Sequence, residues 1–397
     1  MNKIGTIKET NILLLQGPMG YFFRNLDILF SSHGATTFRI GFNLGDWFFS
    51  RKDNYIPYNR PFDEWADFIE DFFNDKSIDK VFLFGDCRIY QRVAIEIAQK
   101  LNIETYVFEE GYVRPNYITL EKWGVNNFSM ISRDKEFYEK LSFDDYHHFK
   151  DNPTNPSFMK MAVSASVYYL LAYFGRFKYP YYKHHRELHP LKEFLYGLRN
   201  VYRKYLYKLL EYKKQNDIIK KKFFFVPLQT YNDFQLKTHS SFSTIEEFIK
   251  LVIASFANAK LDKDIYLVIK HHPMDRGRKN YKRYIDKVAQ SLDIKQQVIV
   301  VYDLHLPTLL SHTLGTVTIN STVGLQALYH NSPVKVMGNA IYDIESLCDK
   351  KSLEYFWINP IKPDHELFEK FRGYLINNTQ INCSFYGDKI TNMELFQ

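Results

Sequence analysis

Short β-like apolar runs recur along this chain, and each is followed by polar or glycine-containing residues and then by a helical pattern. This alternation predicts α/β units in which helices connect parallel strands. In the first half, strands are predicted at 11–15, 37–41, 80–84 and 104–108. In the second half they are predicted at 223–226, 265–270, 298–302, 316–319 and 334–337, with helices at 244–256, 281–292, 323–330 and 366–377. At 397 residues the chain is long enough for two such domains, each with its own core.

Charge divides the chain into three predicted parts. Residues 157–222 hold 15 Lys and Arg against 4 Asp and Glu, although the whole chain has a formal net charge of only +7. The basic character therefore belongs to one segment. We predict an N-terminal Rossmann-like domain at 1–156, a basic aromatic helical connector at 157–221 and a C-terminal Rossmann-like domain at 222–397.

The N-terminal strands lead into loops that are suited to ligands. Loops at the carboxyl ends of parallel strands line the ligand crevice of open α/β sheets. The first loop is neither a Walker A motif nor a dinucleotide fingerprint, but its N–H groups can face an anion, unless its Gly-Pro is a simple turn. We expect four loops at one sheet edge, formed by Gln16-Gly17-Pro18-Met19-Gly20, Asn43-Leu44-Gly45-Asp46, Gly85-Asp86-Cys87-Arg88 and Glu109-Glu110-Gly111.

Glu109 and Glu110 are adjacent carboxylates at the end of a predicted strand. Two neighbouring carboxylates can separate their pKa values, so that one stays ionised while the other holds a proton near neutrality. Arg114 is close enough in sequence to bias that balance. The alternative interpretation is a solvated turn with surface glutamates.

The second half offers donors for a phosphate at its own strand ends. Asn320-Ser321-Thr322 stands where a strand ends and a helix begins, and hydroxyls and N–H groups at a helix N-terminus suit a phosphate. His272-Pro273 follows a neighbouring strand, with Lys270, Arg276 and Arg278 nearby. Each feature alone is common in proteins, but their combination suits a phosphate leaving group.

The connector has two open interpretations. Apolar residues recur at helical spacing on one side of it, and cations occupy the rest. This pattern is typical of a helix that binds an anionic membrane surface, and equally of a helix that packs on a domain core. The 14 apolar residues at 161–174 are too few to span a membrane. The apolar side is formed by Leu191, Leu195, Leu198, Tyr202, Leu206 and Leu209, and the cations are Lys192, Arg199, Arg203, Lys204 and Lys208.

Several classes of protein are disfavoured. The three cysteines are an odd number without paired spacing, which argues against a disulfide framework or a structural zinc site and fits a reducing cytoplasm. No secretory signal is expected, because the first apolar run, 12–15, is too short. No RNP, helix-turn-helix or zinc-finger pattern accompanies the basic segment, so no nucleic acid is expected.

Together these motifs resemble the KpsS/LipB family of capsule polysaccharide proteins, the β-Kdo transferases that begin the lipid-linked Kdo linker of Gram-negative capsules. The resemblance extends over most of the chain from Leu13 to Leu328. The matching segments are LLLQGPMGYFFRNL (13–26), FNLGDW (42–47), LFGDCRIY (83–90), FEEGYVRPNYITLEKWGVN (108–126), PLQTYNDFQ (227–235), KHHPMDRG (270–277) and INSTVGLQAL (319–328).

The resemblance implies a GT-B glycosyltransferase, with two Rossmann-like domains facing a cleft. It implies CMP-β-Kdo as donor and a phosphatidylglycerol-type lipid, in particular the lyso form, as acceptor, with retention of the β-configuration and without a metal or other cofactor. It also implies a cytoplasmic enzyme that is peripheral on the anionic inner membrane, alongside other capsule-assembly proteins such as the transferase that extends the linker.

The resemblance assigns roles to particular residues. Asp233 would be the nucleophile, and Glu109 or Glu110 the acid/base on the acceptor hydroxyl. Retention requires two inversions, which agrees with two carboxylates in these roles. The donor would contact His272, Pro273, Ser321, Thr322, Asn320, Gln229 and Arg276, whereas the acceptor and the anionic Kdo would contact Gln16, Gly17, Asp86, Arg88 and Arg114.

Two kinds of alternative remain at this stage. One keeps the fold but changes the substrates, giving a transferase for another CMP-sugar or an extender of the Kdo linker. The other is a non-catalytic scaffold for capsule export, which would have no use for Asp233, His272 and the glutamate pair. Donor selectivity depends on the shape of a pocket that a sequence does not reveal.

Overall fold

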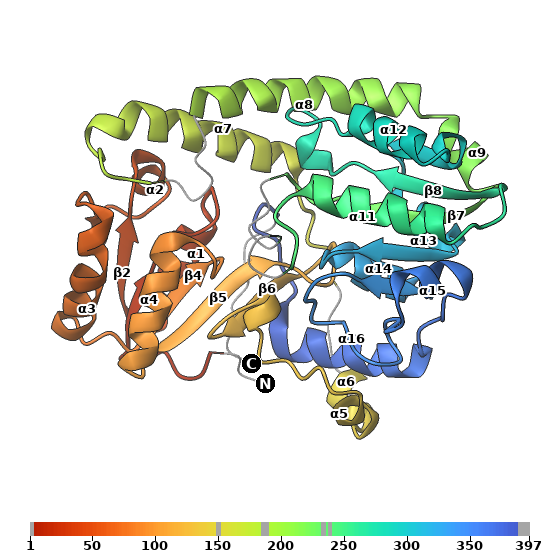
Figure 1. Ribbon diagram of the computed structural model, residues 1–397. Coiled ribbons are helices and arrows are strands. Elements are labelled where there is room, and N and C mark those ends of the chain that lie inside the picture. Colours follow the sequence, from red (N-terminus) through yellow and green to blue (C-terminus); the bar gives the residue numbers. More distant parts are fainter. Residues whose placement is uncertain (1–3, 148–151, 184–189, 232–235, 237–239, 388–397) are drawn as a thin grey trace. The chain divides into compact units, whose positions relative to one another are not determined.

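The computed structural model of the protein describes residues 4–147, 152–183, 190–231, 236 and 240–387 (Figure 1). It contains two compact units. The N-terminal unit comprises Met1–Ile131, Asp144–Leu195 and Gly373–Gln397, and the C-terminal unit comprises Ser132–Phe143 and Tyr196–Arg372. Each unit is built on its own mainly parallel sheet, which confirms the predicted α/β class with two Rossmann-like parts.

The N-terminal unit contains a seven-stranded sheet in the order β12-β6-β5-β4-β1-β2-β3. The strands β1 to β5 run parallel, whereas β6 is antiparallel to β5, and β12 is antiparallel to β6. Their bounds are β1 (Asn11–Leu14), β2 (Thr36–Gly41), β3 (Tyr55–Pro57), β4 (Lys80–Phe84), β5 (Glu104–Glu110), β6 (Ile118–Lys122) and β12 (Gln380–Ile381).

Both faces of this sheet are covered, as β1 illustrates. Leu13 belongs to a buried cluster with Trp65 of α3, while Ile12 and Leu14 belong to a second cluster with Phe30 of α1. Successive residues of a strand point to opposite faces, so an apolar strand without alternation fits a sheet between two helical layers. The helices are α1 (Phe22–Ser32), α2 (Leu44–Phe48), α3 (Trp65–Asp75), α4 (Ile89–Lys100), α6 (Phe143–His147) and α7 (Phe158–Phe174).

The C-terminal unit contains a five-stranded parallel sheet in the order β11-β10-β7-β8-β9. Its strands are β7 (Lys222–Pro227), β8 (Ile265–Lys270), β9 (Val298–Val301), β10 (Gly315–Thr318) and β11 (Val334–Val336). Its helices are α5 (Lys135–Glu139), α9 (Lys214–Ile218), α11 (Ile245–Asn258), α12 (Lys282–Ser291), α13 (Leu306–His312), α14 (Thr322–Tyr329) and α15 (Leu353–Ile358). The longer helices α8 (Pro190–Leu210) and α16 (His365–Thr379) each contain a boundary between the units.

All predicted strands are present, with ends within two residues of those expected. Three further strands, β3, β6 and β12, were not predicted. The strand β5 continues to Glu110, where Glu109 pairs with Thr119 and Glu110 with Ile118. The glutamate pair therefore lies in a strand rather than in the expected loop.

The compact units divide the chain differently from the predicted boundaries at 156/157 and 221/222. The predicted connector is shared, because its residues up to Leu195 belong to the N-terminal unit and those from Tyr196 to the C-terminal unit. The segment from Gly373 returns to the N-terminal unit, where β12 pairs with β6. Among the described residues, no helix is long and apolar enough to cross a membrane.

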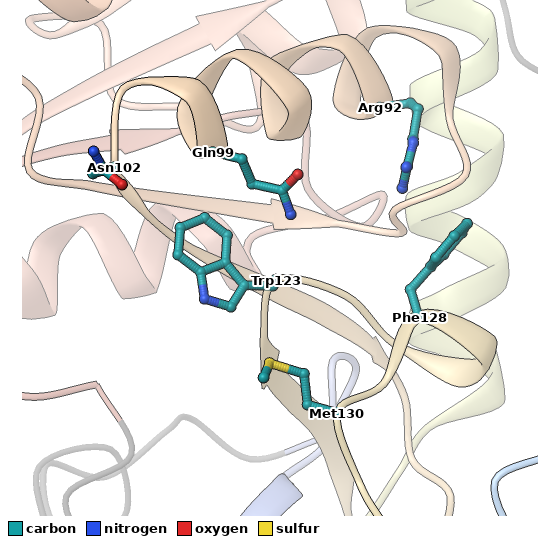
Figure 2. A pocket seen from close by; sticks show the side chains of 6 residues that line it. All are labelled: Arg92, Gln99, Asn102, Trp123, Phe128 and Met130. Atoms are coloured by element: carbon teal, nitrogen blue, oxygen red, sulfur yellow. The ribbon is translucent and has the colours of Figure 1, made fainter.

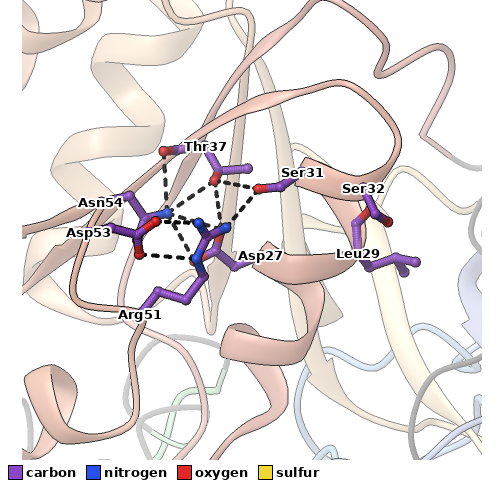
Figure 3. Close-up of polar contacts among 8 residues, drawn as sticks. All are labelled: Asp27, Leu29, Ser31, Ser32, Thr37, Arg51, Asp53 and Asn54. Atoms are coloured by element: carbon purple, nitrogen blue, oxygen red, sulfur yellow. Dashed lines mark hydrogen bonds and ion pairs between the residues drawn. The ribbon is translucent and has the colours of Figure 1, made fainter.

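A buried carboxylate fixes the outer part of the N-terminal sheet (Figure 3). Asp27 of α1, with only 1% exposure, accepts hydrogen bonds from the Thr37 hydroxyl (2.6 Å) and from the Asn54 amide (3.0 Å to each carboxylate oxygen). Arg51 lies 3.5 Å from the same carboxylate and also pairs with the exposed Asp53. This cluster joins α1, β2 and the segment that leads into β3.

We expect Asp27→Ala to lower the free energy of unfolding by about 2–4 kcal/mol, because it leaves buried donors without their acceptor. Urea denaturation followed by circular dichroism measures the change. The control is Asp53→Ala, which removes an exposed partner of Arg51 and should leave the free energy of unfolding nearly unchanged. Equal losses in the two variants would contradict the structural role of Asp27.

Candidate active site

In each sheet one strand is a switch point, because the strands that follow it in the chain lie partly on one side of it and partly on the other. In the N-terminal sheet β1 lies between β2 and β4, and in the C-terminal sheet β7 lies between β8 and β10. Ligands of open α/β sheets bind outside the carboxyl ends of the strands at this switch point. Each unit therefore has one structurally favoured place for a substrate.

In the N-terminal unit, Gln16 and Arg88 meet across the switch point. Gln16 follows β1, Arg88 follows β4, and Arg88 Nη1 donates to Gln16 Oε1 over 3.2 Å. The Gln16 amide nitrogen in turn donates to Asp46 Oδ2 (3.0 Å) and to the Tyr168 hydroxyl (2.9 Å). Because its nitrogen faces these acceptors, the Gln16 oxygen is directed toward Arg88.

Asp46 is the centre of this polar network. It is only 3% exposed and accepts a hydrogen bond from the Phe42 N–H (2.9 Å) and one from the Tyr168 hydroxyl (3.1 Å). Burial raises the pKa of Asp46, while these hydrogen bonds and the charge of Arg39 oppose the rise. The network joins the loop after β2 to α7 and holds Gln16 in place.

Glu109 is an acidic group at this edge whose pKa lies near neutrality. Gly85 has φ +75°, and a Cβ at that position would lie 3.5 Å from Arg88 Nε and 3.7 Å from Glu109 Oε2. Both side chains therefore converge over Gly85. Burial raises the pKa of Glu109 to about 7; the charges of Glu110 and Asp86 add to the rise, and that of Arg88 opposes it. Burial, more than the charge of the adjacent Glu110, thus allows this carboxyl to hold a proton near neutral pH.

Glu110 has different surroundings. Adjacent residues of a strand point to opposite faces, so the two glutamates do not share one site. Glu110 is half-exposed and lies 3.9 Å from Arg114, which is also half-exposed and donates through Nε to Gly111 O (3.2 Å). Burial raises the pKa of Tyr386, and the nearby charge of Glu110 raises it further.

Two of the predicted acceptor residues have structural roles. Asp86 is 1% exposed and accepts a hydrogen bond from the Val125 N–H (2.8 Å), which ties the loop after β4 to the end of the β5–β6 hairpin. At Gly17 a side chain would collide with the ring of Phe23. Both residues shape the edge, as does Gln16, which is only 4% exposed, whereas Arg88, Glu109, Glu110 and Arg114 are more accessible.

In the C-terminal unit, His272 stands at the end of β8 and begins a short 3₁₀ turn at Pro273–Asp275. Its Nδ1 accepts a hydrogen bond from the Met274 N–H (3.2 Å), so the neutral ring carries its proton on Nε2. The adjacent His271 is buried, and burial lowers its pKa to about 4, with a smaller contribution from the charge of Lys270. His272 is thus the histidine of this pair that can donate to a phosphate.

Gln229 and Asn320 meet across the second switch point. Gln229 follows β7, Asn320 follows β10, and Gln229 Nε2 donates to Asn320 Oδ1 over 2.8 Å. Next along the chain, Ser321 caps α14, its hydroxyl oxygen accepting from the Val323 N–H (3.2 Å), and Thr322 is the first helical residue. The N–H groups of Val323 and Gly324 already donate to Ser321, so the hydroxyl proton of Ser321 is the donor that this helix end can offer to a ligand.

Arg276 holds the loop after β8 in shape. It is 8% exposed, it pairs with Asp303, and its Nη1 donates to Pro273 O over 3.2 Å. The guanidinium of Arg276 is thus engaged within the loop, whereas the sequence predicted that it contacts the sugar donor directly. Asp233 lies outside the described residues, but the nearby Tyr231 N–H donates to the buried Asp275 over 2.9 Å. Asp275 therefore anchors the segment that leads toward Asp233.

The helix α8 holds the same loop from outside. Asn200 Nδ2 donates to Pro273 O (3.1 Å), and Arg203 Nη1 donates to Arg276 O (2.6 Å). Gly277 lies so close to the α8 backbone at Tyr196 that a side chain there would collide with it. The side of α8 that packs carries these polar residues and also Tyr207, which stacks on Tyr302 with ring centres 4.2 Å apart, whereas the predicted apolar side is exposed at Leu195, Leu198, Tyr202 and Leu209.

The helix α7 is built similarly in the N-terminal unit. Tyr168 on its inner side contacts Gly45 of α2 and bonds to Gln16, whereas apolar side chains on its outer side are exposed. The exposed apolar residues of α7 and the turn that follows it include Met159, Val163, Leu170, Phe174 and Phe177. The packing interpretation of these apolar faces is thus not supported, because both helices pack through other residues.

Residues 79–386 match the family model described as "Capsule polysaccharide biosynthesis protein". The chain belongs to this capsule polysaccharide biosynthesis family. It is 40% identical over 377 residues to the capsule polysaccharide export protein KpsS of Escherichia coli, covering 94% of this chain and 96% of KpsS. It is also 40% identical over 386 residues to the capsule polysaccharide modification protein LipB of Neisseria meningitidis serogroup A, covering 95% and 91% of the two chains. The predicted resemblance to KpsS and LipB is confirmed.

Among solved structures, the β-Kdo 2,7-transferase KpsC of Thermosulfurimonas dismutans aligns with this capsule protein over 96% of both chains, with a TM-score of 0.44 and 14% identity.

Sequence reasoning missed several residues of the capsule protein's site. Asp46 was part of a quoted motif, but its partner Tyr168 is 122 residues away and no local pattern joins them. Tyr386 belongs to the C-terminal segment that returns to the N-terminal unit through β12. Asp303, the partner of Arg276, follows β9 and was not considered.

The raised pKa of Glu109 predicts a pH-dependent stability. The side chain titrates near 4.5 when unperturbed and near 7 in the folded capsule protein. Folding therefore favours the protonated form, and this contribution is complete below about pH 4.5 and lost as the pH rises through about 7. Relative to Glu109→Gln, which cannot ionise, the wild-type free energy of unfolding in urea should fall between these pH values.

Glu110→Gln serves as the control for this measurement. Glu109 remains in that variant, so the fall should persist, displaced to lower pH because the charge of Glu110 contributes to the raised pKa of Glu109. Parallel pH profiles for the wild type and Glu109→Gln would show that the carboxyl is not perturbed.

Proposed function

We propose that this capsule protein is a retaining β-Kdo transferase, which moves Kdo from CMP-β-Kdo to a phosphatidylglycerol-type acceptor, in particular the lyso form, and so begins the lipid-linked linker of a capsule. Membership in the capsule polysaccharide biosynthesis family supports a role in the synthesis of a capsule. The observation that carries the chemical part is Glu109, a carboxyl with a pKa of about 7 beside Arg88 at the switch point of the N-terminal sheet.

A group with this pKa suits acid/base work on a hydroxyl at neutral pH. With a pKa of about 7 both protonation states of Glu109 are accessible near neutral pH, and the ionised form can accept the proton of the attacking acceptor hydroxyl. Arg88, held by Gln16, supplies a positive charge close to the same point, which suits the carboxylate of Kdo. Of the two candidate glutamates we therefore assign the acid/base role to Glu109.

Retention follows from two displacements. In the first, an oxygen of the Asp233 carboxylate forms a bond to the anomeric carbon, and the bond from that carbon to the phosphate oxygen breaks, so that CMP leaves with the electron pair. In the second, the acceptor oxygen bonds to the anomeric carbon, its proton passes to Glu109, and the bond to Asp233 breaks. Each displacement inverts the anomeric centre, so together they restore its configuration.

Donors for the departing phosphate are available in the C-terminal unit. The His272 Nε2–H and the Ser321 hydroxyl follow β8 and β10, the two strands that flank β7. Such donors stabilise the charge that develops on a leaving phosphate. The Gln229–Asn320 pair supports this edge and lies at the switch point. This scheme uses no metal ion.

The transfer reaction tests the proposal. Purified protein should transfer one Kdo from CMP-Kdo to a fluorescent lysophosphatidylglycerol, with a β-linkage by NMR, and Asp233→Ala should lose at least a thousandfold in rate. Asp217→Ala, a change of the same kind on α9, serves as the control and should retain activity. Transfer only to an acceptor that already carries Kdo would identify an extender of the linker. Transfer of another CMP-sugar in place of Kdo would show that the donor is not CMP-Kdo. No transfer at all would favour the export scaffold.

A lipid acceptor requires attachment to a membrane, and the exposed faces of α7 and α8 suit one. Tyr202 and Tyr205 of α8 are 67% and 66% exposed, and the exposed cations Lys192, Arg199 and Lys208 lie on the same helix. Exposed aromatic and aliphatic side chains beside cations favour a peripheral position on an anionic surface. Arg203, grouped with these cations on sequence grounds, instead holds the loop after β8.

We expect the triple variant Lys192→Gln, Arg199→Gln, Lys208→Gln to bind vesicles of 30% phosphatidylglycerol at least tenfold more weakly in flotation assays, since each cation near an anionic surface contributes about 1 kcal/mol. The matched control replaces the exposed Lys260, Lys263 and Lys295 by Gln and removes the same charge elsewhere on the C-terminal unit. Equal loss in both triple variants would indicate a general charge effect and not a surface on α8.

A further inference from the structure

A hollow of about 390 Å³ lies beside α4 in the N-terminal unit (Figure 2). One wall is formed by α4 and the residues just after it, and the other wall is formed by the segment that follows β6. None of these residues belongs to the candidate active site. The hollow is lined by Arg92, Gln99, Asn102, Trp123, Phe128 and Met130.

Trp123 has a backbone conformation that is costly for its side chain. Its φ is +72°, in the left-handed region that favours glycine, and a bulky residue there is an outlier that costs roughly 1–3 kcal/mol. Core packing does not explain this cost, because the indole is half-buried and is not a member of the buried clusters of the described residues. Figure 2 shows the indole between the side chains of Gln99 and Met130.

The aromatic side of the hollow is preformed. The backbone N–H of Trp123 donates to Thr105 O of β5 (2.9 Å), and the backbone N–H of Phe128 donates to Val125 O (3.0 Å). The guanidinium carbon of Arg92 lies 4.4 Å from the centre of the Phe128 ring. Groups held on a sheet and a tight turn lose little freedom when they bind a ligand.

We propose that this hollow binds a segment of oligosaccharide. The negative face of an indole attracts the C–H groups on one side of a sugar ring. The amides of Gln99 and Asn102 offer both donors and acceptors for hydroxyl groups. The Nε of Arg92 already donates to Glu96 over 2.9 Å, and its two Nη groups offer donors for the carboxylate of an acidic sugar. An acyl chain would leave these amides without a function, which favours the saccharide.

The length of the hollow indicates more than one sugar unit. Arg92 and Gln99 are seven residues apart on α4, which corresponds to about 10 Å along the helix axis at 1.5 Å per residue. The Arg92 N–H bonds to Arg88 O (2.8 Å), so one end of the hollow is a single helical turn from the candidate acceptor edge. The inference goes beyond the proposed function, because it assigns a place to a glycan that is neither the donor nor the lipid.

The test measures binding without donor or acceptor, so its outcome is independent of whether the protein transfers Kdo. A Kdo oligosaccharide is titrated into protein labelled with 5-fluorotryptophan, whose four signals arise from Trp47, Trp65, Trp123 and Trp357. We expect a saturable shift of the Trp123 signal. By calorimetry, Trp123→Gly should weaken binding at least tenfold, and Trp47→Leu, a change at another exposed tryptophan, should not.

Thermal stability separates recognition from a structural role. Glycine adopts positive φ without cost, so Trp123→Gly should keep or raise the melting temperature while binding is lost. The variant Arg92→Gln, Gln99→Ala repeats the binding test at helix positions without altering the turn and should also bind at least tenfold more weakly. Unchanged binding in both variants, no saturable shift, or a Trp123 shift caused only by monomeric lysophosphatidylglycerol would overturn the proposal.

Discussion

Buried carboxylates that accept backbone N–H groups hold the loops on which the rest of this structure depends. Asp46 holds Phe42 after β2, Asp86 holds Val125 after β6, and Asp275 holds Tyr231 after β7. A buried carboxylate is stable only when such donors satisfy it, and the loop that supplies them is fixed in return. Each edge thus obtains its shape from acidic residues that take no part in the chemistry.

This division of roles separates the structural carboxylates from Glu109, the proposed acid/base. Asp86 and Asp46 are almost fully buried and bonded to backbone N–H groups, whereas Glu109 lies at the edge and accepts a bond only from the adjacent Glu110 N–H among the contacts described for it (3.0 Å). Its raised pKa results mainly from burial, with the charges of Glu110 and Asp86 as further causes. The structural carboxylate Asp86 therefore also tunes the chemical one.

The sequence was sufficient for what depends on local patterns. The apolar runs of β1, β4 and β8 predicted the strands and, with them, the loops that carry Gln16, Arg88 and His272. It was insufficient where the partner is distant: the short strand β12 completes the sheet of the N-terminal unit from the other end of the chain, and the bonds of Asp86 and Arg276 depend on Val125 and Asp303. The residue types at these positions suggested that Asp86 and Arg276 contact a substrate. Only the three-dimensional contacts showed that both side chains are bonded to other parts of the protein.

The clamp between α8 and the His272 loop makes two distant properties of the chain interdependent. One side of the helix bonds to Pro273 and Arg276, and its other side is an exposed surface of tyrosine and leucine. A ligand that immobilised the outer side would also restrict the loop, so the loop would lose less conformational entropy on binding the phosphate proposed for it. Thermodynamic reciprocity requires that a phosphate bound by the loop strengthen the hold on the outer side by the same factor.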